Sequence, residues 1–271
     1  MWTRIASTVL LCSVAALAGA ADLLLAQQGE AAPGRLVRVQ LVPGTQAWLD
    51  GTPLSVSANG WAAFGFDRDA SGQRVLRLVG NGREQRVEFV LPAGDWPLQR
   101  VNGVPPRTVA PPPPAVQERI RAEAALMAKA RAVHSQLEDF TTAFRWPLSG
   151  RISGVYGSQR IYNGTPGSPH LGLDIAAPTG SKVQAPAGGV VTLVHQDMFY
   201  NGGTLVIDHG EGVASTFIHL NAVHVEQGQR VEAGDWVADV GATGRASGPH
   251  LHWVVNWFDV RLDPLPLLPP R

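Results

Sequence analysis

The chain has 271 residues, which is enough for two domains of ordinary size, each with its own core. Its 22 basic residues balance its 22 acidic residues, so no overall positive field would attract nucleic acid or an anionic membrane surface. A hydrophobic content of 45% with 30 glycines and 21 prolines indicates a folded, mainly β protein with many turns and short strands.

The first 20 residues have the features of a secretory signal peptide. A basic residue precedes an uncharged apolar run at 5–18, and the small residues 18–20 form a cleavage pattern. The run is too short to cross a bilayer as a helix, although the leucines 23–25 could extend it into a retained anchor or shift cleavage as far as residue 26. We therefore expect a periplasmic or secreted protein with no stable membrane insertion after cleavage. The only cysteine, Cys12, lies in this segment, so the mature fold cannot depend on disulfides.

Residues 33–109 alternate β-rich stretches with turn signals, which predicts a small β domain. Asp50-Gly51 and Asn81-Gly82 stand where a tight hairpin needs residues that accept a positive φ. Pro105-Pro106 and the prolines at 111–114 indicate an extended spacer after the domain. The expected strands are 35–42, 46–49, 61–66, 74–79 and 86–91.

Residues 110–145 are predicted to be this Pro-rich linker followed by a helix. The stretch 115–144 is rich in Ala, Glu, Arg and Leu and contains no Gly or Pro, which favours one continuous helix. We expect one apolar face of the helix to pack against one of the two domains. That face would carry Leu126, Val133, Leu137, Phe140 and Phe144.

Residues 146–271 return to short, valine-rich segments bounded by glycine, which predicts an antiparallel β sandwich or barrel. This region carries 7 basic and 10 acidic residues, whereas residues 33–109 carry 9 basic and 6 acidic residues. The opposite net charges favour docking of the N-terminal domain on the C-terminal domain. The expected strands are 183–184, 190–194, 204–208, 214–220, 231–240 and 250–258.

Two segments could together supply a metal site. His170 and Asp174 lie in a stretch whose Pro and Gly residues disfavour a helix, and in an extended chain residues four apart face the same side. His250 and His252 would likewise share one side of a strand. Three nitrogen or oxygen ligands with one open position are typical of catalytic zinc, and a remaining histidine could exchange protons near neutral pH. The pairing of the two segments is not visible in the sequence.

A series of short motifs follows in order through residues 146–265: Tyr156-Gly157, Pro169 to Asp174, Ile175 to Gly180, Val183 to Pro186, Val206 to Gly210, Phe217 to Leu220, Gly241 to Gly244, and Ser247 to Trp253. Through these motifs the region resembles the lysostaphin-type, or LytM-like, family of zinc metallopeptidases. The resemblance implies the LytM-like fold, an antiparallel β sandwich or barrel built from a duplicated hybrid motif, and a peptidoglycan peptide as substrate.

The resemblance also implies one zinc ion held by His170, Asp174 and His252, with His219 and His250 as the catalytic histidines. One of these two would activate the attacking water, and the other would stabilise the oxyanion or protonate the leaving amine. Which histidine has which role stays open. The family commonly has Tyr two residues before the catalytic histidine, where this chain has Phe217, which we interpret as a core substitution.

The N-terminal part resembles, through its order of small domain, linker and helix, some secreted Gram-negative members of the family. Two other functions fit the sequence less well. A non-catalytic LytM-like regulator of another cell-wall hydrolase could share the fold, but this chain has the expected metal-binding or catalytic residue at all five site positions. A lipoyl or phosphotransferase carrier is suggested by the glycines around Val231, but the only lysine after the helix, Lys182, lies outside that hairpin.

The remaining histidines are given structural roles. His209 precedes a glycine at a strand end and is expected in a turn or behind the ligands. His134, His195 and His224 are expected at the surface or as hydrogen-bonded core groups.

Overall fold

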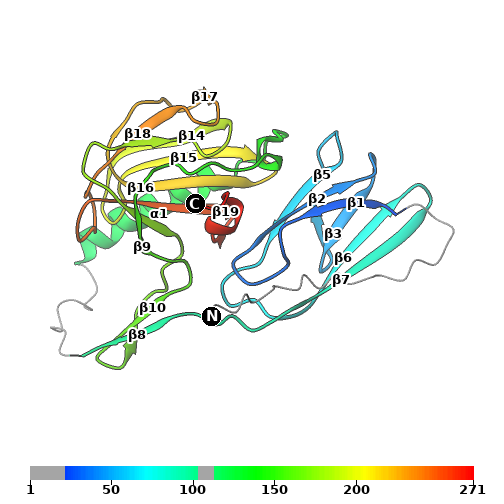
Figure 1. Ribbon diagram of the computed structural model, residues 1–271, viewed down its shortest axis with the longest axis horizontal. Coiled ribbons are helices and arrows are strands. Elements are labelled where there is room, and N and C mark those ends of the chain that lie inside the picture. The colour runs from blue at the N-terminus through cyan, green and yellow to red at the C-terminus, as the bar shows by residue number, and fades with distance from the viewer. Residues whose placement is uncertain (1–21, 103–112) are drawn as a thin grey trace, which may run out of the picture.

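The computed structural model describes residues 22–102 and 113–271, and these residues are mainly β (Figure 1). The predicted signal peptide at 1–20 and most of the Pro-rich spacer lie outside the described residues. Within the described ranges, no helix combines the length and the apolar character that a membrane crossing requires.

The N-terminal domain is built from two antiparallel sheets that enclose one core (Figure 1). The sheets have the orders β1-β2-β5 and β4-β3-β6-β7. Asp50 and Asn81 have φ values of 49° and 50°, and each precedes a glycine with positive φ, as the predicted tight hairpins require. The strands are β1 Leu24–Gln28, β2 Leu36–Leu41, β3 Gln46–Leu49, β4 Thr52–Leu54, β5 Trp61–Gly65, β6 Gly72–Gly80 and β7 Arg83–Leu91.

Both ends of this domain differ from the predicted range of 33–109. Leu23 is 1% exposed in the core, and β1 pairs with β2, so the domain starts before residue 33. Of the leucines 23–25 that seemed able to extend the leader, Leu23 is buried in this core, whereas Leu25 is 57% exposed. At the other end, β8 (Leu98–Val101) pairs in parallel with β10 (Gln159–Tyr162) and therefore belongs to a sheet with the C-terminal region.

The predicted helix at 115–144 is wrong in its second half. Helix α1 spans Pro114–Arg131, and the N–H of Ala132 closes it on the carbonyl of Ala128 at 2.9 Å. Leu126 is 44% exposed, and Val133 is 37% exposed, so the expected apolar face does not form. Phe140 and Phe144 are buried in the C-terminal core, but an irregular segment carries them there.

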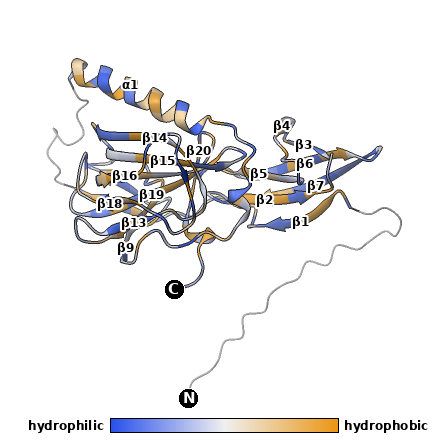
Figure 2. Ribbon diagram, turned by 90° about the horizontal axis from the view of Figure 1, so that it is seen from above, coloured by the Kyte–Doolittle hydropathy of each residue, from blue (hydrophilic) through white to orange (hydrophobic). Residues whose placement is uncertain are grey.

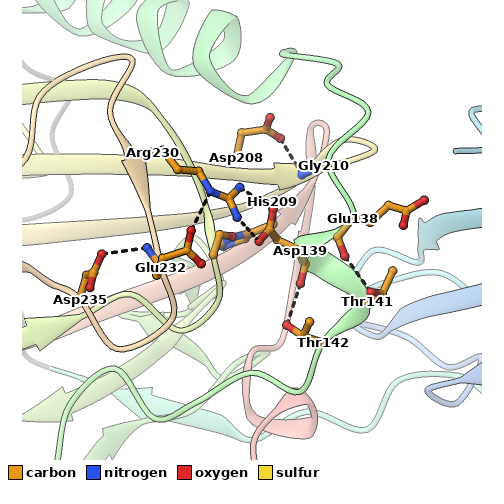
Figure 3. Close-up of polar contacts among 11 residues, drawn as sticks. Glu138, Asp139, Thr141, Thr142, Asp208, His209, Gly210, Arg230, Glu232 and Asp235 are labelled. Atoms are coloured by element: carbon orange, nitrogen blue, oxygen red, sulfur yellow. Dashed lines mark hydrogen bonds and ion pairs between the residues drawn. The ribbon is translucent and has the colours of Figure 1, made fainter. Parts of the chain in front are cut away.

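Tertiary contacts determine the path of the chain after α1. The Ser135 hydroxyl donates to Asp208 Oδ2 at 2.5 Å. Asp139, in a short 3-10 helix at Asp139–Thr141, accepts two hydrogen bonds of 2.7 Å from Arg230, which fasten the segment to the C-terminal sheet (Figure 3). Helix propensity could not predict this segment, because its partners lie 73 and 91 positions further along the chain.

The C-terminal domain has a ten-stranded antiparallel sheet that follows the path β17-β14-β15-β16-β19-β12-β9, with β13, β18 and β20 attached. The predicted strand at 231–240 is interrupted, because Gly234, with φ of 100°, forms a turn between β17 and β18. A short 3-10 helix, Leu265–Leu267, follows the sheet. The strands of this sheet are β9 Arg151–Gly154, β12 Leu173–Ala176, β13 Lys182–Gln184, β14 Gly189–Met198, β15 Gly202–Gly210, β16 Val213–Val223, β17 Arg230–Val231, β18 Trp236–Val240, β19 His250–Trp257 and β20 Val260–Leu262. The short strand β11, Thr165–Pro166, pairs with β10 in the separate sheet that contains β8.

Helix α1 covers the face of this sheet that points away from the main core (Figure 2). Met127 and Ala130 of the helix form a small apolar cluster with Leu193, Met198, Val206 and Ala214 of the sheet. The helix therefore packs on the C-terminal domain, and the sheet is buried on both faces where the helix lies.

A buried arginine links β2 to the segment that follows α1 and gives a stability prediction. Arg38 of β2 is 9% exposed and donates to the carbonyls of Phe140 and Thr142 at 2.8 and 2.9 Å. Arg38→Leu should lower the free energy of unfolding by about 2–4 kcal/mol, because two carbonyls lose their donor. Urea unfolding would measure this, with the exposed Arg86→Leu as a control expected to change stability by less than about 0.5 kcal/mol. Equal effects of both variants would contradict this role of Arg38.

Candidate active site

Strands β12 and β19 place two of the predicted ligands side by side. Asp174 lies directly opposite His252 in the antiparallel register. Because side chains alternate along a strand, Leu173 and Ile175 enter the core while Asp174 points to the other face. The same alternation buries Leu251 and Trp253 and leaves His250 and His252 beside Asp174.

His170 reaches the same place from a loop, not from the strand that the sequence predicted. Strand β12 begins at Leu173, three residues after His170. The backbone of His170 is paired with the preceding loop: its N–H donates to the Ser158 carbonyl, and its carbonyl accepts from the Gly157 N–H, both at 2.7 Å. The predicted convergence with Asp174 is thus found, but loop pairing produces it.

Three donor atoms from these residues form a compact triangle. His170 Nε2 lies 3.0 Å from Asp174 Oδ1, and His252 Nδ1 lies 2.7 Å from the same oxygen. The two histidine nitrogens are 3.1 Å apart. Zinc bonds of about 2.0 Å in tetrahedral geometry would separate ligand atoms by about 3.3 Å. Two imidazole nitrogens and one carboxylate oxygen at this spacing therefore fit a zinc ion, and among the described residues this is the one metal-type cluster found.

His219 and His250 stand next to this triangle. Their ring centroids are 4.8 Å apart, and His250 Nε2 lies 3.8 Å from Asp174 Oδ1. The ring of His219 is 6.2 Å from that of His252. The structure thus brings all five predicted site residues into one cluster.

Backbone carbonyls fix the orientation of three of the rings. The Nδ1 of His170 donates to the Val155 carbonyl at 3.0 Å. The Nδ1 of His219 donates to the Thr243 carbonyl at 2.9 Å, and that of His250 donates to the Gly248 carbonyl at 2.8 Å. Each of these rings therefore has Nε2 as the nitrogen that is not bound to a backbone carbonyl. In His170 that nitrogen faces the triangle of donor atoms, and in His219 and His250 it remains available to another partner.

The charge states follow from burial and from these contacts. Burial alone would raise the pKa of Asp174, but hydrogen bonds from His170 and His252 outweigh it and hold that pKa well below its usual range. Burial lowers the pKa of His219 to about 4, and the neighbouring His250 and His252 add to the effect. Asp174 is therefore an anion and His219 a neutral imidazole near pH 7, as metal binding and proton acceptance require.

His219 has a strained backbone. Its φ is 65°, which non-glycine residues rarely adopt, and its N–H donates to the Asn201 carbonyl at 2.7 Å. The pairing of β16 with β18 shifts register just beyond this residue. The irregularity turns the imidazole toward the cluster. No local pattern in the sequence predicts this irregularity.

The cluster lies at the junction of two hollows. A groove of 820 Å³ is bordered by His170, Asp174 and His250, and residues 97–99, at the start of β8, form part of its wall. A recess of 470 Å³ begins at His170 and His252 and extends under helix α1. Elements that precede the C-terminal domain thus contribute to both sides of the site.

Two glycines allow the predicted ligands to approach one another, and neither is among the predicted site residues. A Cβ at Gly154 would meet Asp174 Oδ2 at 2.3 Å, and a Cβ at Gly172 would meet His252 Nε2 at 2.6 Å. Only Gly172 has a signal in the sequence, because it lies between His170 and Asp174, whereas Gly154 meets Asp174 through the pairing of β9 with β12.

Gly154→Ala should therefore weaken zinc binding by about 10-fold or more, because the added methyl group displaces the carboxylate. Metal titration calorimetry would measure the loss. Gly248→Ala is the matched control, since a Cβ there meets nothing within 4 Å. Unchanged affinity in Gly154→Ala would show that the carboxylate does not need its present position.

The other histidines lie away from the cluster. His209 is fully buried, donates through Nδ1 to the Gly188 carbonyl at 2.6 Å and accepts through Nε2 from the Ser215 hydroxyl at 2.8 Å. It is a core residue of β15 and not part of a turn, and its ring nitrogens bind Gly188 and Ser215. The other three each have a hydrogen-bonded neighbour: His134 with Glu211, His195 with the Asp197 N–H, and His224 with Asp239.

Phe217 occupies the position where the resembled family commonly has Tyr. Its side chain is fully buried and stacks on Trp253, with ring centroids 6.2 Å apart and planes inclined by 15°. The residue packs in the core below the cluster, in agreement with its interpretation as a core substitution.

Comparison with known proteins identifies the family. Residues 168–264 match the sequence profile of peptidase family M23. A Pseudomonas aeruginosa structure described as a peptidase M23 superposes with a TM-score of 0.68 at 30% identity, over 88% of this chain and 95% of the other. The chain therefore belongs to peptidase family M23.

Individual relatives share the C-terminal domain. Peptidoglycan DD-endopeptidase ShyA of Vibrio cholerae is 36% identical over 112 residues, which are 40% of this chain and 26% of ShyA. DD-carboxypeptidase/endopeptidase Mpg of Neisseria meningitidis is 39% identical over 100 residues, which are 37% of this chain and 22% of Mpg. A lipoprotein NlpD/LppB homolog of Pseudomonas aeruginosa is 32% identical over 126 residues, covering 46% and 40%. The chain thus spans about a quarter of the length of ShyA and of Mpg.

Proposed function

We propose that this chain is a zinc-dependent metalloendopeptidase that hydrolyses peptide bonds of cell-wall peptidoglycan, in cross-links or in stem peptides. The observation that carries the proposal is the convergence of His170, Asp174 and His252 on one point of a groove, with His219 and His250 beside them. The name of ShyA, a peptidoglycan DD-endopeptidase, supports peptidoglycan as the substrate, and the name of Mpg supports endopeptidase activity.

The proposed mechanism assigns His170, Asp174 and His252 to one zinc ion. When bound, zinc would polarise the scissile carbonyl and make water a stronger nucleophile. The two other histidines would exchange protons through Nε2, since each commits Nδ1 to a backbone carbonyl. His219 is a neutral acceptor near pH 7, because burial lowers its pKa to about 4. His250 lies nearer to Asp174, where it could orient water or donate to the leaving amine.

Muropeptide analysis tests this proposal. Purified mature protein would be incubated with peptidoglycan, with and without a chelator, and the released fragments identified by mass. We expect cross-linked dimers to disappear only without chelator, and readdition of zinc to restore their loss. Hydrolysis that a chelator leaves unchanged would refute the zinc mechanism.

The same assay separates the enzyme from the alternative, a non-catalytic regulator of another cell-wall hydrolase. The similarity to an NlpD/LppB homolog is the observation that keeps this alternative in view. A regulator would release no fragments alone but would raise the activity of an added hydrolase. The complete cluster of donor atoms favours the enzyme, since a regulator needs no ligands.

We also propose that the N-terminal domain stays docked on the C-terminal domain and works with it in the periplasm or outside the cell. Arg68 donates to the Gly157 carbonyl at 2.9 Å, and Trp96 packs edge-on against Tyr156. A fragment of residues 113–271 keeps Phe140 and Phe144 in the core and is suited to the test. Equal rates and equal wall binding of fragment and full chain would remove any role for the docked domain.

A further inference from the structure

The recess under helix α1 continues the groove along one strand. On β19, alternation puts Val254 and Asn256 on the same face as His252, and all three line the recess. Helix α1 forms the opposite wall through Ile120, Glu123, Ala124, Met127 and Arg131. A peptide that reaches the cluster could thus extend into this recess of 470 Å³ between β19 and α1.

The lining of this recess has unused hydrogen-bond donors. Asn256 is 1% exposed, its Oδ1 accepts from the Thr216 hydroxyl at 2.9 Å, and its Nδ2 has no partner. The side chain of Arg131 is 12% exposed, and its Nε has no partner. A buried donor without a partner is destabilising, so a ligand that supplies an acceptor would recover the lost hydrogen bond.

The charges around these donors also favour an anion. Arg131 is 3.8 Å from one carboxylate oxygen, that of the exposed Asp259, and Arg261 lines the same recess. Burial and the charge of Arg261 lower the pKa of Arg131. Such a shift is typical of a cation whose charge is only partly balanced by nearby anions. The carboxylate of Glu123 does not compensate it, because its two oxygens bind the Arg119 guanidinium and the Phe199 N–H.

We infer that this recess is a substrate subsite that receives a free carboxylate of the peptide, which Arg131 and the amide of Asn256 bind. The inference rests on the proposed peptidase function and specifies its substrate as an acidic peptide. Peptides of peptidoglycan offer such carboxylates. Helix α1, which precedes the matched region 168–264, is then a part of the substrate site.

Paired peptides test the subsite. Two labelled stem-type peptides would be compared, identical except that one has its free carboxylates converted to amides. Binding is measured by fluorescence anisotropy with the full mature chain, and cleavage is measured with zinc present and with chelator. We expect the acidic peptide to bind about tenfold more tightly, the effect of one charge-assisted hydrogen-bonded pair.

Three variants separate the subsite from general stability. Arg131→Gln should remove the preference for the acidic peptide, whereas Arg121→Gln, an exposed change on the same helix, should keep it. Ala124→Trp should weaken binding of both peptides by filling the recess from the exposed surface of α1, where the larger side chain needs no core space. Equal binding of the two peptides to the wild-type chain, or no binding of either, overturns the subsite. Failure of the proposed peptidase function would be seen separately, because neither peptide would then show cleavage that a chelator prevents.

Discussion

Replacement of His170 by alanine is expected to weaken zinc binding by at least about 100-fold and to abolish hydrolysis of peptidoglycan. His170 Nε2 lies 3.0 Å from Asp174 Oδ1 and 3.1 Å from His252 Nδ1, so its removal leaves two donor atoms of the proposed three. Titration calorimetry with zinc would give the affinity, and release of muropeptides would give the activity.

The control for this variant is His224→Ala. His224 pairs with Asp239 at 2.9 Å and contacts the ring of Trp236, away from the cluster. It should bind zinc with wild-type affinity. If His170→Ala bound zinc as tightly as this control, His170 would not be a ligand.

His250→Ala should separate metal binding from catalysis. The ring lies beside the triangle of donor atoms but is not one of its corners, so one zinc ion per chain should remain bound. We expect kcat to fall by about 100- to 10,000-fold, the usual contribution of a group that transfers protons. Initial rates on a cross-linked peptide, with zinc content measured on the same sample, would show both effects.

His195→Ala is the matched control for His250→Ala, because His195 lies on β14 and accepts from the Asp197 N–H. Its rate should equal that of the wild-type chain. A His250→Ala variant with full activity would leave His219 as the single proton-exchanging histidine. A variant without zinc would make His250 a ligand in place of one of the three proposed ones.

Sequence patterns predicted those strands and turns well whose formation depends on residues near them in the chain. The strand at 46–49 has the predicted ends, and the Asp50-Gly51 hairpin has the predicted positive φ values. Alternation in Leu251 to Trp253 correctly put His250 and His252 on one face. These features depend on neighbours in the sequence, so the sequence contains the information.

Features that depend on distant partners could not be predicted. Helix α1 ends at Arg131 because the residues after it contact the C-terminal sheet. Strand β8 pairs with β10, which lies about 60 residues later in the chain. In the site, His170 and Asp174 converge through a loop, and the approach of the donor atoms needs Gly154 beside Asp174. Asn256 could have been found, because it lies four residues after His252 on a strand and therefore on the same face.

The most direct test of the central claim is an anomalous difference map at the zinc absorption edge, from crystals of the full mature chain grown with zinc. We predict one peak per chain, in contact with Nε2 of His170, Nδ1 of His252 and a carboxylate oxygen of Asp174. A well-ordered crystal in which this position shows no peak, or in which zinc binds elsewhere, would contradict the proposed metallopeptidase.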